Sequence, residues 1–118
     1  MPDPQPVVVV IGVDPRTSGR AFEAMRIGVG VVAGENEVTF VLRGPAVHLL
    51  DADTDDLVDG DDIAKFRENL KRLEVPFHVE ETAIPTAPDW NESGHPIVLV
   101  SRPQIGALVR QARRFIVF

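Results

Sequence analysis

Cysteine is absent from this sequence of 118 residues. Its absence excludes a disulfide-stabilised scaffold, an iron–sulfur cluster, a cysteine-ligated zinc site and a thiol nucleophile. Apolar runs are short as well: Val7–Val13 spans seven residues, whereas a membrane-spanning helix needs about 20. The preceding residues, Met1–Pro6, lack the basic start of a signal peptide. We therefore expect a cytoplasmic protein without a membrane segment.

Basic residues are fewer than acidic ones, 12 against 18, and the net charge is -6. This balance argues against nucleic acid as the main partner. The segment Asp51–Asp62 holds seven of the acids and no base, so the other residues carry eleven acids and twelve bases. The acidity therefore belongs to one segment. The length fits a single domain over residues 1–118.

The acidic segment partly matches the ligand spacing of a calcium-binding EF-hand loop. Five aspartates fall at positions 1, 3, 5, 9 and 12 of an EF-hand: Asp51, Asp53, Asp55, Asp59 and Asp62. Position 6, which needs glycine, is Asp56, and position 12 is not the bidentate glutamate. The three histidines, His48, His78 and His95, are not spaced as metal ligands. We expect a solvated acidic loop, and neither a metal site nor a cofactor.

Apolar and amphipathic segments alternate along the chain. The predicted strands are Val7–Val13, Glu37–Leu42, Phe77–Glu81, Pro96–Val100 and Phe115–Phe118. The predicted helices run from Thr17 or Ser18 to Ala33, over Pro45–Leu50, from Asp61 or Asp62 to Glu74, and from Ser101 to Arg114, with a loop over Ala83–Gly94. Several strands are apolar on both faces, which is typical of a parallel sheet. The alternation predicts an α/β sandwich with a mainly parallel sheet.

Two local signals refine these helices. Ser101 and Gln104 have the spacing of a capping box, which marks the start of the last helix. Gly28 and Gly30 each cost the first helix about 1 kcal/mol relative to alanine. We expect another part of the backbone to approach the helix closely at both glycines.

The order of segments resembles the DsrE/DsrF-like family of sulfur-relay and sulfur-oxidation proteins. The resemblance is carried by the helix Ala21–Arg26, by Glu37–Val47 (EVTFVLRGPAV) and by the terminal Ala112–Phe118 (ARRFIVF). It implies a three-layer α/β/α fold with a five-stranded parallel sheet. It also implies a homo-oligomer, a trimer or a hexamer.

In catalytic members of the family, a cysteine just after the third strand carries a persulfide. The matching position lies near Glu81 or Thr82, and Pro85 and Pro88 would break the helix that follows that cysteine. The resemblance therefore points to members without the cysteine. It implies a non-catalytic binding or assembly protein, associated with sulfur metabolism through a sulfur-relay partner, or else a remnant subunit without activity.

Candidate ligand contacts follow the predicted strands, because the carboxyl edge of a parallel sheet is where ligands bind. Arg16 and Arg20, in the loop after the first strand, could hold a small anion together with backbone N–H groups of the next helix. A capped loop with solvated arginines is the alternative. The predicted ligand site at this edge is completed by Asp14, His48, Glu81 and Thr82.

Acid–base chemistry is the second functional hypothesis. His48 follows the second strand and could pair with Asp14 or Glu81 in a small enzyme that acts on an anionic metabolite. A packing histidine is the alternative reading. The single tryptophan, Trp90, lies in the long loop, and we interpret it as an oligomer contact rather than a plug for the pocket.

Overall fold

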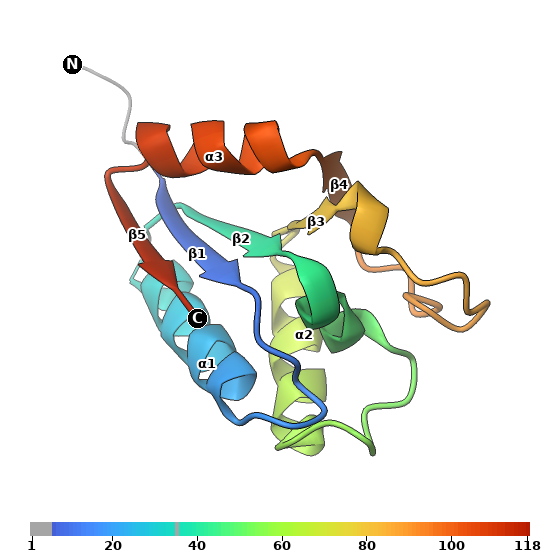
Figure 1. Cartoon of the computed structure of the whole chain (residues 1–118). Helices are drawn as coiled ribbons and strands as arrows, with labels where there is room; N and C mark the ends of the chain where they lie inside the picture. The colour runs from blue at the N-terminus through green and yellow to red at the C-terminus, as the bar shows by residue number, and fades with distance from the viewer. Residues whose placement is uncertain (1–5, 35) are drawn as a thin grey trace.

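The computed structural model describes residues 6–34 and 36–118 (Figure 1). Its centre is a five-stranded sheet in the order β4-β3-β2-β1-β5, and every neighbouring pair of strands is parallel. The strands are β1 (Val7–Ile11), β2 (Val38–Leu42), β3 (Phe77–Glu80), β4 (Ile97–Val100) and β5 (Arg114–Val117). The sheet is thus fully parallel, where the sequence predicts a mainly parallel one.

Helices cover both faces of the sheet, which confirms the three-layer α/β/α fold (Figure 1). The helices are α1 (Arg20–Ala33), α2 (Gly60–Arg72) and α3 (Arg102–Gln111), with short 3-10 helices η1 (Gly44–Leu50) and η2 (Glu81–Ala83). The first face packs against α1, α2 and η1, and the second face packs against α3. No described helix is both long enough and apolar enough to pass through a membrane.

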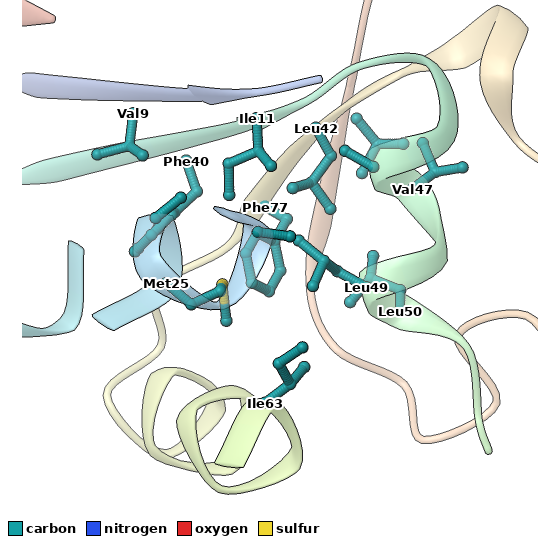
Figure 2. Close-up of a cluster of buried hydrophobic side chains, with 14 of the residues drawn as sticks. Val9, Ile11, Met25, Phe40, Leu42, Val47, Leu49, Leu50, Ile63 and Phe77 are labelled. Carbon is teal, nitrogen blue, oxygen red and sulfur yellow. The ribbon is translucent and has the colours of Figure 1, made fainter. Parts of the chain in front are cut away.

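The larger core lies between the sheet and the layer of α1, α2 and η1. Figure 2 shows side chains of both layers meeting there, among them Phe40 and Phe77 from the sheet and Met25 from α1. The Phe40 and Phe77 rings are 5.4 Å apart between centroids. Alternate residues of the strands supply this core, so the opposite set of strand residues faces α3.

The two glycines of α1, Gly28 and Gly30, have different surroundings. A Cβ atom added to Gly28 would overlap the ring of Phe40, so the missing side chain lets α1 lie close to the sheet. The close neighbour is therefore an aromatic ring and not backbone. Nothing lies within 4 Å of a Cβ at Gly30, so the expectation of a close approach there was wrong.

The smaller core lies under α3 and contains Val8, Val10 and Val41 from the sheet with Ile105 from the helix. It is much smaller because the short helix α3 crosses a sheet that is five strands wide. As a result, the edge strand β5 exposes apolar side chains on this face.

Element bounds differ from the prediction mainly at the helix ends. The helix α1 begins at Arg20 because the backbone N–H groups of Thr17 and Ser18 already bond to the carbonyl of Asp14 in a turn. The helix α3 ends at Gln111 because Arg114 pairs with Val7 in the sheet. The predicted capping box of Ser101 and Gln104 is present with both of its hydrogen bonds.

Candidate functional site at the carboxyl edge of the sheet

The segments predicted to bind a ligand all lie at one edge of the sheet. The loop after β1, η1 after β2, η2 after β3 and the start of α3 after β4 follow the carboxyl ends of parallel strands. In open α/β sheets this edge is the usual place for ligands. The structure therefore puts the predicted residues on a suitable edge, and their individual contacts decide what they can do.

Asp14 and Arg16 form a two-pronged ion pair within the loop after β1. Arg16 donates its Nε–H to Oδ1 of Asp14 at 3.0 Å and its Nη2–H to Oδ2 at 2.9 Å. The hydrogen bonds from Arg16 are the main reason that the pKa of Asp14 is lowered, and nearby His48 lowers it further. The guanidinium of Arg16 is therefore already paired within its own loop, so it is less available to bind an anion.

Arg20 lies at the first position of α1 and is exposed. Its guanidinium carbon is 5.9 Å from the centre of the Phe118 ring, a cation–π distance. Gly12 donates its backbone N–H to the carbonyl of Phe118 at 2.7 Å, so β1 and the residue after β5 are tied together beside Arg20.

His48 pairs with Asp51 and not with either of the predicted partners. Its Nδ1 lies 3.0 Å and 3.1 Å from the two carboxylate oxygens of Asp51. The two residues are three positions apart at the end of η1, so local geometry brings them together. Arg67 from α2 supports the pair by donating Nη1–H to the Asp51 carbonyl at 2.6 Å. Asp14 is near enough to His48 for this imidazole to be a minor cause of the lowered pKa of Asp14.

Glu81 and Thr82 lie in η2 and are both exposed at the carboxyl end of β3. Trp90 is half-buried against the larger core, and its indole N–H donates to the carbonyl of Val47 at 2.8 Å. The indole thus fastens the long loop to η1 within the chain. A contact of Trp90 with another subunit stays a prediction.

Sequence reasoning missed the most buried charge at this edge, Glu80, the last residue of β3. Its Oε1 accepts the backbone N–H of Gly44 at 3.1 Å, and its Oε2 accepts the Nε–H of Arg102 at 3.2 Å. Arg43 and Arg102 line a cavity of about 250 Å³ together with this carboxylate. An acidic residue that closes an apolar, buried strand was the signal that could have pointed to it.

The other two histidines are structural. His95 is buried, packs with a tilted ring against Phe77 and forms a hydrogen bond through Nε2 to the carbonyl of Val75 at 3.0 Å. His78 faces α3, and its Nδ1 is buried without a hydrogen-bond partner among the described residues. Burial is the main cause that lowers the pKa of both imidazoles.

The acidic segment forms a loop and the first turn of α2. Within residues 6–34 and 36–118, no group of three or more His, Cys, Asp or Glu side chains is arranged to hold a metal ion. Asp59 adopts a left-handed backbone, with φ of 57°, and Oδ1 of Asp53 accepts the N–H of Asp55 at 2.8 Å. These local contacts shape the loop without gathering its carboxylates into a cage.

Comparisons with known proteins were made for both sequence and structure. No protein-family model matches the sequence, and no curated protein matches it. Among solved structures, the fold is similar to that of the ychN protein from E. coli, with a TM-score of 0.76. The match covers 97% of this chain and 99% of that chain at 19% sequence identity, so it speaks to the fold. The chain thus has the α/β fold of the ychN protein, in agreement with its resemblance to the DsrE/DsrF-like family, and without cysteine it is not a cysteine-dependent sulfurtransferase.

Proposed function

We propose that this protein is a non-catalytic, homo-oligomeric binding and assembly module. The observation that carries the proposal is the apolar surface of the edge strand β5. Phe115 and Val117 are 56% and 55% exposed. They lie on the same face of one edge strand, and contiguous exposed apolar patches with a polar rim mark interaction sites.

The register of the sheet explains why the side chains of Phe115 and Val117 are exposed. Phe115 pairs with Val8 and Val117 pairs with Val10, so both project toward the face that α3 covers. Val8 and Val10 are buried under α3, whereas the two residues of β5 lie beyond the helix at the edge of the sheet. An edge strand also presents unpaired backbone groups, which a second chain can cover.

Charge supports a second copy of this chain as the occupant. A largely apolar hollow of about 680 Å³ lies beside Phe115, and its rim carries Arg110, Arg113 and Arg114. The acidic segment Asp51–Asp62 lies at the opposite end of the molecule, in the loop before α2 and its first turn (Figure 1). A basic surface and an acidic surface at opposite ends favour a head-to-tail contact between copies. A head-to-tail contact forms a ring when the rotation between copies closes, and this is the arrangement that the proposed oligomer requires.

The remaining parts of the proposal come from the family resemblance and from the sequence. The resemblance gives a trimer or a hexamer as the size of the ring. It also gives a sulfur-relay protein as partner and a link to sulfur metabolism. The expected compartment is the cytoplasm. Each of these stays a prediction.

Substitution on β5 tests the assembly role. Phe115→Asp combined with Val117→Asp places charge on two exposed positions, so the monomer should still fold while the oligomer dissociates. Leu73→Asp is the matched control, because Leu73 is 60% exposed at the end of α2. Sedimentation velocity should show monomers for the β5 variant and wild-type oligomers for the control. An oligomer that survives both β5 substitutions would contradict the proposed surface.

A small acid–base enzyme is the second candidate, and the geometry of His48 favours it. When Nδ1–H of His48 donates to Asp51, its Nε2 is the proton acceptor, which is the arrangement of a general base. Turnover of a panel of phosphate and carboxylate esters would test it. Loss of turnover in His48→Gln supports an enzyme. Equal rates for the variant and the wild type, or no turnover by the wild type, contradict the acid–base hypothesis and favour the assembly role.

A further inference from the structure

We propose that the cavity between β2, β3 and α3 binds the oxyanion group of a small ligand, a phosphate or a carboxylate. The cavity of about 250 Å³ is lined by Arg43, Glu80, Arg102, Ile105 and Gly106. This site is separate from the β5 surface, and the inference goes beyond the assembly role. It also differs from the predicted ligand site, whose Arg16 is already paired with Asp14.

The buried carboxylate of Glu80 holds both sides of the cavity in place. Oε1 accepts the N–H of Gly44, which directly follows Arg43 and has a positive φ of 53°. Oε2 accepts the Nε–H of Arg102. The side chain of Glu80, at the carboxyl end of the internal strand β3, therefore fixes both the turn that carries Arg43 and the side chain of Arg102. Glu80 is a positioning residue in this account.

The two guanidinium groups supply the binding chemistry. The Nε–H of Arg102 is used by Glu80, so its two Nη groups are left for another acceptor. Arg102 is 80% exposed, and Arg43 is exposed and makes no ion pair with any residue that the structure describes. The paired N–H groups of a guanidinium match the two oxygens of a carboxylate or a phosphate.

Charge and size select the ligand class. Two guanidinium groups and one carboxylate leave a net positive charge in the cavity, so an anion is favoured. Ile105 and the bare backbone of Gly106 form its other wall, where there is room for a small carbon skeleton. Since ligand sites for drug-sized molecules measure about 300–1,000 Å³, this volume suits a small metabolite.

Isothermal titration calorimetry with inorganic phosphate and with succinate tests the site in the full-length protein. Arg43→Gln and Arg102→Gln remove one charge each from exposed side chains and should each weaken binding at least tenfold. Arg26→Gln is the matched control, because Arg26 is an exposed arginine of α1 that pairs with Glu23. Binding of phosphate alone or succinate alone identifies the group that the site prefers. Absence of binding by both probes at 10 mM, or equal weakening by the control, overturns the proposal.

A second variant separates binding from folding. Gly106→Leu adds a side chain at the wall of the cavity in α3, where leucine is a better helix former than glycine. The added Cβ meets only the terminal Nη1 of Arg110, at 3.2 Å, which a flexible arginine side chain can move aside. The variant should keep its melting temperature or raise it while losing binding at least tenfold. Wild-type affinity in Gly106→Leu would show that the probes bind elsewhere. Oligomer mass is measured in the same samples, so failure of this site is distinguishable from failure of the assembly role.

Discussion

Glu80 and Arg102 form an ion pair of unequal burial: the carboxylate side chain is 6% exposed and the guanidinium side chain is 80% exposed, with Oε2 and Nε 3.2 Å apart. The buried carboxylate also accepts the backbone N–H of Gly44. The Nε–H of Arg102 is held by this carboxylate, whereas its two exposed Nη groups stay open to another acceptor. The pair therefore fixes the position of an arginine that remains free to bind.

Glu80→Ala should lower the free energy of unfolding by about 1–3 kcal/mol, because the partly buried N–H of Gly44 loses its acceptor. Urea denaturation measures the change. Glu80→Gln retains an amide oxygen for Gly44 and should lose less. If Glu80→Ala is as stable as the wild type, the carboxylate does not organise this edge.

Gly28→Ala should destabilise the protein by about 1–3 kcal/mol, because the added methyl group overlaps the ring of the buried Phe40. Gly30→Ala is the matched control on the same helix, where the methyl group meets nothing within 4 Å. There, alanine should stabilise α1 by up to about 1 kcal/mol. Melting temperatures of the two variants should therefore move in opposite directions, and a shift of both in the same direction would contradict the packing described.

The free energy of unfolding should fall as the pH decreases from 7 to 5. Burial lowers the pKa of His78 and His95 below 6.5 in the folded state. As the pH falls through this range, the unfolded chain therefore binds more protons than the folded chain, which favours unfolding. Stability from this source is complete above pH 6.5 and is lost as the pH falls toward the lower pKa values of the folded state. Urea denaturation across this range measures the effect.

His78→Leu removes one of the two buried imidazoles and so separates the contribution of His78 from that of His95. Its Nδ1 is buried and has no hydrogen-bond partner within residues 6–34 and 36–118, so an apolar side chain of similar size should keep or raise stability at pH 7. The variant should also lose less stability than the wild type between pH 7 and pH 5. An unchanged pH dependence would show that His78 does not contribute.

The layers of this fold could be predicted because the signals for them are local. The all-apolar β1 indicates a strand buried on both faces, and the stripe of α2 from Ile63 to Leu70 indicates which side of that helix packs inward. The capping box of α3 is read from Ser101 and Gln104 alone. None of these signals depends on distant residues.

The contacts of the site could not be predicted because they join distant segments. Glu80 is buried only because β3 lies inside the sheet and α3 returns over it, which brings Arg102 to a residue 22 positions earlier. The partner of His48 could not be predicted for a different reason, because the two residues are close in the sequence. Its partner Asp51 is three residues away, yet the acidic segment offers several aspartates, and only the turn at the end of η1 selects this one.

The mass of the protein in solution tests the central claim most directly. One chain has a mass of 12.9 kDa. Light scattering after size exclusion, at micromolar concentration, should give three or six times this value, since we propose that a second copy covers the apolar residues of β5 and the family resemblance implies a trimer or a hexamer. A single species with the mass of one chain would contradict the assembly role.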